Sequence, residues 1–309
     1  MAVLNCPFGI LEGSEAMPEG KIIKALSGFY YVFDHAKVWQ CRGRGVFRKQ
    51  KVSPLVGDNV IFQAENELEG YILEIKERKN ELIRPPVANI DQAILVFSAV
   101  EPEFSPLLLD RFLVLVEFNH IQPVICLTKM DLLTAEKMDE IQAYADQYRS
   151  IGYKVVLTSS EKGMGIESLL PYLEGKISVF AGQSGVGKSS LLNALKPELA
   201  LKTSNISTHL GRGKHTTRHV ELLSVGNGWV ADTPGFSSLE LLDLEAEQLT
   251  TCFPELQTAS EQCKFRGCLH LKEPKCAVKA GVETGNIQPY RYNHYLNFLK
   301  EIKERKPRY

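Results

Sequence analysis

The segment Gly182–Ser189, with the sequence GQSGVGKS, fits the spacing G-x-x-x-x-G-K-[ST] of a phosphate-binding loop. In such a loop, glycines let backbone N–H groups turn inward around phosphate oxygens, and the following helix adds the positive end of its dipole. Lys188 would lie against the β- and γ-phosphates, and Ser189 would bind Mg²⁺. A chance glycine-rich turn is disfavoured because an apolar strand precedes the loop and a helical stretch follows it. The residues expected to contact nucleotide here are Gly182, Gln183, Ser184, Gly185, Val186, Gly187, Lys188, Ser189 and Ser190.

The tetrapeptide Asp232-Thr233-Pro234-Gly235 follows another apolar strand, WVADT, downstream of this loop. Asp232 is placed to hold Mg²⁺ through water, and the amide of Gly235 is placed to meet the γ-phosphate. Asp, Pro and Gly are turn formers, so an isolated tetrapeptide of this kind would more often be a plain turn. Its position after both a strand and the phosphate loop favours the nucleotide role.

Two further segments could read the base. Thr128-Lys129-Met130-Asp131 ends the strand QPVICLTK, and the Asp131 carboxylate can accept both the N1–H and the exocyclic N–H of guanine. Adenine offers an acceptor at N1 and would leave the charge unpaired. Ser159 and Ser160, in TSSE, end the next strand and could present a backbone N–H to guanine O6. Either match alone could be a capping turn, but together they favour GTP over ATP.

The motif order is therefore T-K-x-D, T-S-S, phosphate loop, switch threonines and D-x-x-G, which indicates a circular permutation of the usual GTPase order. A sheet keeps its site when its termini are moved, since chain ends usually lie close together at the surface. The segment that carries Asp232 and Gly235 then runs directly into the C-terminal unit. We expect the nucleotide state to be transmitted to that unit.

Candidates for the hydrolysis step lie in GRGKHTTR, where Thr216 or Thr217 would complete the Mg²⁺ shell. The sequence does not choose between these two threonines. The residue after D-x-x-G is Phe236, whereas Ras-like enzymes use a glutamine there to orient the attacking water, so intrinsic turnover should be slow. His215 is the nearest polar substitute. It could equally be an exposed basic residue that contacts a phosphate backbone, and a partner could supply the missing group.

A cysteine cluster near the C-terminus has the spacing C-x4-C-x-H-x5-C, formed by Cys263, Cys268, His270 and Cys276. Three thiolates and an imidazole suit tetrahedral Zn²⁺, and four protein ligands make the site structural. Zinc would also compensate for the small core of this unit. Free thiols are the less favoured alternative. The other cysteines are interpreted as ordinary residues: Cys6, Cys41, Cys126 and Cys252.

The elements that must position these residues fall into three predicted domains, 1–75, 76–242 and 243–309. The first contains five short β segments without a helix and favours a small barrel of the OB-fold type. These segments are Lys21–Leu26, Phe29–Phe33, Val38–Cys41, Asn59–Phe62 and Tyr71–Ile75.

From Ile90 onward, apolar strands alternate with helices, which is typical of a doubly wound parallel sheet. Ser105 can cap one helix that Pro106 begins, and another helix should begin near Thr134. Ligands of such sheets bind beyond the carboxyl ends of the strands, where the motifs lie. The third domain should be mainly α, with a helix over Pro289–Lys306.

Composition fits a folded chain, with 44% hydrophobic and 24% charged residues among 309. Apolar runs are far shorter than a membrane span, and the N-terminus lacks the pattern of a secretory signal, so we expect a cytoplasmic protein without membrane contact. Lys21–Lys51 contains eight basic residues and one acid. Its run RGRGVFRK contains Phe47 and lies near Trp39 in the sequence, and both rings could stack on RNA bases, although a solvated basic loop is the alternative.

The chain resembles the ribosome small-subunit-dependent GTPase A family over nearly its whole length. The resemblance rests on RGRGVFRK, VGDNV, GRGKHTT, DTPGF, the permuted motifs and the cysteine cluster. It implies an N-terminal OB-fold, a permuted α/β GTPase domain, a zinc-binding C-terminal domain, GTP or GDP with Mg²⁺, and one structural Zn²⁺. It also implies a role in late maturation of the small ribosomal subunit, with GTP hydrolysis stimulated by that subunit.

The expected partners are the small ribosomal subunit, its rRNA and other assembly factors, and a monomer is the default. One departure is Thr128, where most GTPases have Asn; guanine selection by Asp131 should survive this change, but affinity should fall. The competing interpretation is a GTP-gated adaptor that recruits a protein through its zinc domain. That adaptor would show no rise in hydrolysis when small subunits are added.

Overall fold

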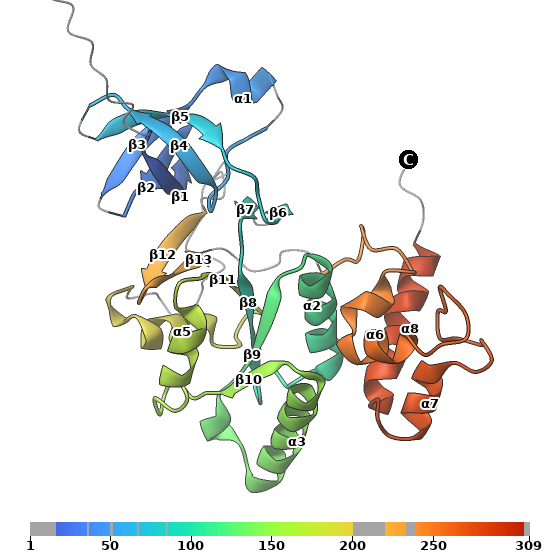
Figure 1. The fold of residues 1–309 in the computed structure, drawn as a ribbon. Helices are drawn as coiled ribbons and strands as arrows, with labels where there is room; N and C mark the ends of the chain where they lie inside the picture. Colours follow the sequence, from blue (N-terminus) through green and yellow to red (C-terminus); the bar gives the residue numbers. More distant parts are fainter. Residues whose placement is uncertain are drawn as a thin grey trace, which may run out of the picture.

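A computed structural model of the chain describes residues 17–35, 37–49, 52–66, 68–83, 86–199, 220–232 and 239–305. These residues form a β-barrel, a central sheet covered by helices on both faces, and a C-terminal group of helices. The barrel lies at one end of the central sheet, and the C-terminal helices lie beside α2 (Pro106–Phe118; Figure 1).

The barrel contains the five predicted strands. They are β1 (Glu19–Leu26), β2 (Phe29–Phe33), β3 (Val38–Gly43), β4 (Asn59–Ala64) and β5 (Glu69–Ile75). The strand order is β1-β2-β3-β5-β4, and β4 pairs back onto β1 to close the barrel. Alternate residues such as Ile22, Val32 and Phe62 are fully buried inside it. A short helix that the sequence did not predict, α1 (Gly45–Lys49), lies within the basic run.

The prediction that Trp39 and Phe47 stack on RNA bases is wrong. Trp39 is only 8% exposed and Phe47 only 7%, because the alternation of β3 turns Trp39 inward and Phe47 packs into the same core. The Trp39 ring lies against Phe62, with 5.4 Å between ring centroids, and its Nε1–H donates to Asp34 Oδ2 at 2.5 Å. These side chains therefore belong to the barrel core.

The central sheet has five parallel strands in the order β10-β9-β8-β11-β13. They are β8 (Gln92–Ser98), β9 (Gln122–Thr128), β10 (Lys154–Leu157), β11 (Ile177–Ala181) and β13 (Gly228–Asp232). The predicted doubly wound arrangement is confirmed. The sequence analysis missed β12 (Glu221–Val225), which is antiparallel to β13 and pairs with β1 on its other side. Through β12, the barrel and the central sheet form one continuous 11-stranded sheet.

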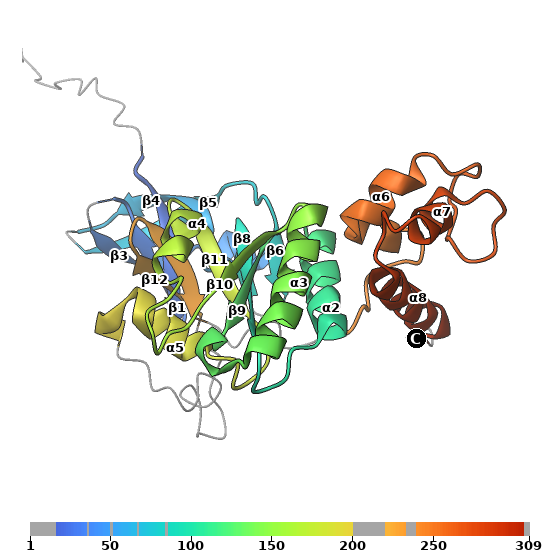
Figure 2. The same cartoon turned by 90° about the horizontal axis from the view of Figure 1, so that it is seen from below.

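Both faces of the central sheet are covered, which explains why its strands read as uninterrupted apolar runs. In β8, Leu95 and Phe97 belong to the core under α2 and α3, whereas Ile94 and Val96 belong to the core under α4 and α5. Figure 2 shows the two helix pairs on opposite sides of the strands. The helices are α2 (Pro106–Phe118), α3 (Ala135–Ile151), α4 (Leu170–Leu173) and α5 (Lys188–Leu195).

Two predicted helix starts are confirmed. Ser105 Oγ accepts a hydrogen bond from the Leu108 N–H at the start of α2, and Thr134 Oγ1 accepts one from the Lys137 N–H at the start of α3. A small hairpin, β6 (Glu81–Ile83) and β7 (Pro86–Ala88), joins the barrel to the sheet. Short 3-10 turns cover Met130–Leu132, Glu167–Leu169, Pro197–Leu199 and Leu249–Cys252.

The C-terminal unit contains α6 (Pro254–Ser260), α7 (Ala277–Glu283) and α8 (Pro289–Glu304). The predicted helix at 289–306 is therefore confirmed, with its end two residues earlier. Its core includes the buried side chains Phe253, Leu256, Val278, Tyr295 and Phe298. Val114 of α2 belongs to the same core, so this unit completes its packing against the GTPase domain.

A buried ionic network holds this interface. Asp110 of α2 is fully buried, and its Oδ1 accepts from Arg291 Nη1 of α8 at 2.5 Å and from the Tyr148 hydroxyl of α3 at 2.6 Å. Arg291 also contacts Glu255 of α6 through Nε at 2.7 Å, and His294 Nδ1 lies 2.6 Å from Asp110 Oδ2. Buried charges cost several kcal/mol each unless they are paired in this way, so the network fixes how the helices meet.

Candidate nucleotide site and candidate metal centre

The parallel register brings the sequence motifs to one edge of the central sheet. Ser98 at the end of β8 is level with Thr128 at the end of β9, and Leu157 of β10 is level with Leu127. Ala181 ends β11 immediately before the phosphate loop, and Asp232 ends the neighbouring β13. The carboxyl edge of a parallel sheet is where ligands of this fold bind.

The phosphate loop has a backbone that only glycine adopts easily. Gly182, Gly185 and Gly187 have φ values of 147°, 82° and 96°, in the region that L side chains rarely enter. A Cβ on Gly182 would also lie 2.0 Å from the carbonyl oxygen of Val96. Gly187 leads directly into α5, so the loop delivers its backbone N–H groups to a helix N-terminus.

The side chains of the loop divide by role. Gln183 and Ser184 are exposed at its crest, and Ser190 is half-buried on α5. Val186 is 1% exposed and packs into the core under α5, which anchors the loop to the sheet. Ser189, the predicted Mg²⁺ ligand, is 6% exposed on the first turn of α5.

Lys188 is folded back onto its own loop. Its Nζ donates to the carbonyl oxygens of Gly182 at 2.7 Å and Gln183 at 2.6 Å. Burial lowers the pKa of Lys188 from its ordinary value to about 8, because the charged ammonium loses solvation. A triphosphate in the loop would replace these neutral carbonyls with anionic oxygens and would favour the charged form.

Thr128 connects the base-reading segment to the phosphate loop. It is 2% exposed, and its hydroxyl oxygen lies 2.6 Å from the Val186 carbonyl oxygen and 3.2 Å from that of Phe97. A hydroxyl has one hydrogen to donate, and the shorter contact assigns it to Val186. The Thr128 hydroxyl therefore makes a direct tie from the end of β9 to the phosphate loop.

Asp131, the predicted guanine reader, is held in place by the next strand loop. Its Oδ1 accepts from Ser159 Oγ at 2.5 Å, and that same Oγ accepts from the Lys162 N–H at 3.1 Å. Ser159 is fully buried, while Asp131 is partly exposed at the edge. Ser160 follows directly and is half-buried. The two segments that are predicted to read the base therefore support each other through side chains.

Met130 helps to hold the predicted base-reading segments together through its backbone. Its side chain is only 2% exposed and packs in the core. Its N–H donates to the Thr158 carbonyl oxygen at 3.2 Å and so joins the two base-reading segments. Lys129 has a left-handed backbone, with φ of 60°, and its Nζ donates to the carbonyl oxygen of Glu101.

That contact with Glu101 reveals a contributor that sequence reasoning missed, the loop after β8. Ser98 Oγ accepts from the backbone N–H groups of Val100 at 3.3 Å and Glu101 at 3.0 Å, which sets the start of this loop. Pro102 then approaches Gly185 of the phosphate loop. The signal that could have indicated it was the serine closing the strand IDQAILVFSAV at the edge where every other motif lies.

Four predicted catalytic residues, His215, Thr216, Thr217 and Gly235, lie outside the described residues, as does the side chain of Asp232. The backbone of Asp232 is described and pairs with Glu221 of β12. Ala231 is level with Val179 of β11, which places the end of β13 beside the strand that leads into the phosphate loop. P-loop GTPases hold Mg²⁺ through a carboxylate that follows such a strand, and Asp232 remains the predicted residue for that role.

The cysteine cluster converges in space. The ligand atoms of Cys263, Cys268, His270 and Cys276 all lie within 4.8 Å of one another. The Cys263 and Cys276 sulfurs are 3.9 Å apart, and His270 Nδ1 lies 3.3 Å from the Cys276 sulfur. Tetrahedral zinc with bonds of about 2.0–2.3 Å places its ligand atoms about 3.3–3.8 Å apart, so the donor set and its spacing fit zinc.

Surrounding contacts hold the cluster loops in place. His270 is fully buried with a left-handed backbone, and its carbonyl oxygen accepts from the Tyr292 hydroxyl at 2.6 Å. The Glu273 carboxylate accepts from the N–H groups of Leu269 and Leu271 at 3.0 and 2.7 Å. Burial raises the pKa of the Cys276 thiol, and a bound metal cation would favour its thiolate form.

The parallel sheet, its phosphate loop and the guanine-reading motif placed before that loop define a circularly permuted P-loop GTPase. Residues 75–242 match the family model described as RsgA GTPase, and residues 19–72 match the RsgA N-terminal domain. The chain belongs to the RsgA GTPase family. Within the described residues, none of the helices combines the length and apolar character that crossing a bilayer demands.

Relatives and solved structures agree with this assignment. The chain is 66% identical over 293 residues to the small ribosomal subunit biogenesis GTPase RsgA of Bacillus anthracis, which covers 95% of this chain and 100% of that protein. It is also 66% identical over 298 residues to the protein of that name from Bacillus subtilis, with the same coverage. The structure is similar to that of YloQ, a circularly permuted GTPase, with a TM-score of 0.84 and 60% identity over 96% of this chain and 98% of that one. The structure is also similar to that of YjeQ from Thermotoga maritima, with a TM-score of 0.82 and 39% sequence identity. That match covers 94% of this chain and 99% of the other.

Proposed function

We propose that this chain hydrolyses GTP to GDP and phosphate during maturation of the small ribosomal subunit, and that the subunit stimulates the reaction. One observation carries the proposal. Parallel strand ends place the phosphate loop, Asp131 and the end of β13 at one edge, in a chain 66% identical to small ribosomal subunit biogenesis GTPases.

In this proposal Asp131 selects guanine, because its carboxylate accepts two N–H groups that adenine does not offer. Ser159 holds that carboxylate in position, and Thr128 fixes the distance between the base end and the phosphate loop. Lys188 moves from the loop carbonyls to the phosphate oxygens. Both ends of the nucleotide site are therefore tied to β9: Asp131 follows its end, and Val186 of the phosphate loop is bound by Thr128.

We assign Mg²⁺ binding to Ser189 and Asp232, with Thr216 or Thr217 completing the shell; Mg²⁺ supplies charge neutralisation at the phosphates. Gly235 donates its amide to the γ-phosphate. Phe236 cannot orient water, so His215 or a group from the ribosome performs that step. A zinc ion held by Cys263, Cys268, His270 and Cys276 has a structural role because all four ligands come from the protein.

The partner in this proposal is the small ribosomal subunit together with its rRNA and other assembly factors, and the protein works as a cytoplasmic monomer. Contacts between the basic side chains of the barrel and the RNA phosphates would make RNA binding weaken steeply as the salt concentration rises, because neutralising phosphates releases counterions. Changes at the γ-phosphate reach the C-terminal unit through the segment after Asp232. Hydrogen exchange in α6–α8 should therefore differ between GDP and a non-hydrolysable GTP analogue.

The deciding experiment measures GTP hydrolysis, with ATP as control, with and without purified small ribosomal subunits across a salt series. Salt-sensitive stimulation for GTP alone supports the proposal. A Lys188→Ala variant should lose at least about 100-fold in kcat/KM, because it removes a cation from the phosphates. Lys154→Ala, at the opposite end of β10, is the matched control and should retain activity.

A GTP-gated adaptor is the alternative function, and exposed apolar side chains beside the cysteine cluster favour it. Phe265 is 44% exposed and Leu271 is 39% exposed, and both lie in the loops that carry the ligands. Unchanged slow hydrolysis in the presence of small subunits would favour this adaptor over the subunit-stimulated enzyme.

A further inference from the structure

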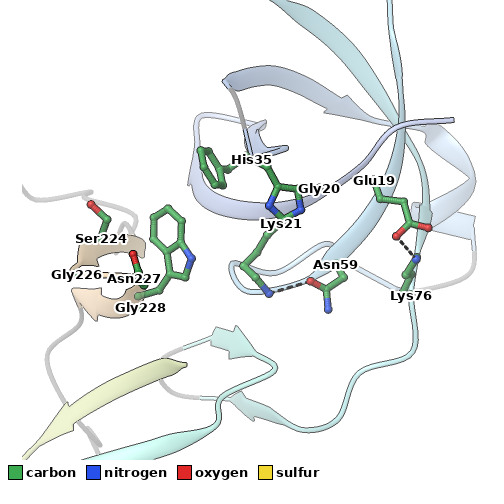
Figure 3. Close-up of a pocket in the computed structure, with 12 residues that line it drawn as sticks. Glu19, Gly20, Lys21, His35, Asn59, Lys76, Ser224, Gly226, Asn227 and Gly228 are labelled. Atoms are coloured by element: carbon green, nitrogen blue, oxygen red, sulfur yellow. Dashed lines mark hydrogen bonds and ion pairs between the residues drawn. The ribbon is translucent and has the colours of Figure 1, made fainter. Parts of the chain in front are cut away.

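A pocket of about 710 Å³ lies between the barrel and the turn that joins β12 to β13 (Figure 3). We call it the junction pocket. Lys21, Asn59 and Lys76 line it from the barrel, and Asn227 and Trp229 line it from the hairpin. It lies at the amino end of β13, at the opposite end of that strand from the predicted nucleotide site. Its volume lies in the range of small-molecule sites.

The pocket has an aromatic wall. Trp229 is only partly buried, and its ring meets Phe33 edge to face, with centroids 5.4 Å apart and planes at 67°. The exposed His35 has its ring 6.3 Å from Phe33, and its φ of 76° is a conformation that non-glycine residues seldom adopt. Trp39, by contrast, is closed into the barrel core. Trp229, rather than Trp39, therefore offers aromatic surface to a ligand.

The pocket also carries positive charge. Lys21 Nζ donates to Asn59 Oδ1 at 2.8 Å, as Figure 3 shows, and within the described residues it forms no ion pair with a carboxylate. Burial lowers the pKa of Lys21, while the charges of Asp91 and Asp58 act in the other direction. Lys76 is paired with Glu19 at 2.5 Å. An anionic group beside Lys21 would stabilise an ammonium that otherwise loses hydration.

We propose that the junction pocket receives one unpaired nucleotide of single-stranded RNA, with its base against Trp229 and its phosphate beside Lys21 and Lys76. The side-chain amides of Asn59 and Asn227 have donors and acceptors for the base edge or the ribose. An aromatic face with adjacent cations is the usual means of holding a single strand.

An RNA strand, rather than a free nucleotide, fits the surroundings. The pocket lies at the Phe33 end of β2, whereas Arg42 and the basic run that follows it lie at the Phe29 end of that strand. A strand of RNA that follows β2 away from the pocket would therefore bring further phosphates to these cations. The inference rests on the proposed function in that the RNA would be ribosomal. A nucleotide held here would contact both the barrel and the hairpin that ends at Asp232, and so would fix these two parts relative to each other.

Tryptophan fluorescence tests the inference directly, because the chain has two tryptophans and only Trp229 lines the pocket. The full chain, saturated with GDP so that its nucleotide site is filled, is titrated with an oligoadenylate of about eight nucleotides. We expect quenching in the wild type and its loss in Trp229→Phe, where only Trp39 remains. Absence of quenching in the wild type, or equal quenching in both proteins, would overturn the proposal.

Charge variants supply a second readout, the anisotropy of a labelled oligoadenylate. Lys21→Gln should weaken binding about tenfold, whereas Lys300→Gln, a matched change on the exposed face of α8, should leave it unchanged. If both variants weaken binding equally, RNA binds through the overall positive charge of the protein, and the assignment of the pocket is overturned. AMP that binds as tightly as the oligomer would overturn the RNA assignment.

Stimulation of GTP hydrolysis by small subunits is measured on the same preparations. If small subunits stimulate hydrolysis but the wild type shows no quenching of Trp229, the proposal for the junction pocket is wrong and the proposed function still holds. Quenching without stimulation would contradict the proposed function but retain an RNA-binding pocket.

Discussion

The nucleotide edge and the cysteine cluster are built in opposite ways. The nucleotide edge assembles residues from Ser98 to Asp232, and parallel strand register alone brings them together. The cluster draws all its ligands from Cys263 to Cys276, a single run of chain closed by loops. The nucleotide edge therefore keeps its shape as long as the sheet is folded. The shape of the cysteine cluster depends instead on the metal ion that its side chains bind.

The GTPase domain and the C-terminal unit meet at the buried network around Asp110. This network is independent of both sites, because it joins α2 and α3 of the GTPase domain to α6 and α8. Any signal between the nucleotide site and the C-terminal unit therefore passes beside this buried interface. The comparison therefore predicts where each change acts most strongly: metal loss in the C-terminal unit, nucleotide-site changes at the sheet edge, and interface changes in both.

The largest effect is expected from losing a metal ligand. Cys276→Ala, or removal of metal with a chelator, should unfold the cluster loops and α7, because zinc binding supplies about 10 kcal/mol or more to such small units. Metal content by mass spectrometry and hydrogen exchange of α7 measure the effect. GTP affinity should change little.

Cys252→Ala is the matched control for this change. Cys252 is buried in the same unit but lies outside the cluster, so its loss should cost about 1 kcal/mol and leave the metal bound. Equal unfolding in both variants would mean that the cluster stabilises the unit no more than any buried thiol.

A smaller but still large effect is expected at the interface. Asp110→Asn removes a fully buried charge that Arg291 contacts, and should lower the free energy of unfolding by about 3 kcal/mol. Thermal or urea denaturation followed by circular dichroism would measure it. The C-terminal helices should lose protection from hydrogen exchange first.

Glu301→Gln tests the same interface from its rim. Glu301 pairs with Arg111 between α8 and α2, but its side chain is 44% exposed, so its loss should cost about 0.5 kcal/mol. A cost as large as that of Asp110→Asn would show that burial does not set the strength of these contacts.

Specificity at the nucleotide edge should follow Asp131. In Asp131→Asn the amide can donate to the 2-oxo group of xanthine, so GTP binding should fall by about 100-fold and xanthosine triphosphate should be preferred. Competition binding with the two nucleotides provides the measurement. Asp139→Asn, an exposed acid on α3, should leave the preference for GTP intact.

The smallest effect is expected at Thr128. Thr128→Ala removes the hydroxyl that donates to Val186 and should weaken GTP binding about fivefold, roughly 1 kcal/mol, whereas Thr128→Ser should be nearly neutral. Nucleotide affinity by calorimetry separates the two variants. Identical GTP affinities of the Ala and Ser variants would show that the hydrogen bond from position 128 to Val186 does not affect nucleotide binding.

Local patterns carried much of the prediction. The five barrel strands, the caps at Ser105 and Thr134 and the parallel strands all follow from alternation, capping residues and apolar runs. Trp39 shows where such patterns fail. A tryptophan beside a basic run is compatible with either stacking on RNA or packing in a core, and only the inward face of β3 selected the core.

Other features depended on contacts between distant segments. β12 is short and pairs with β13 and β1, and its sequence offered no separate signal. The network of Asp110, Arg291 and Glu255 joins residues far apart in the chain, so no motif could indicate it.

The sequence by itself determined the chemistry, because phosphate loops, guanine-reading carboxylates and cysteine clusters depend on residue types at short spacing. The tertiary structure decided which surfaces are open and which parts move together. Burial, register and cavities arise from packing between segments, and these placed Trp39 in a core, joined the barrel to the GTPase sheet through β12, and opened the junction pocket beside Trp229.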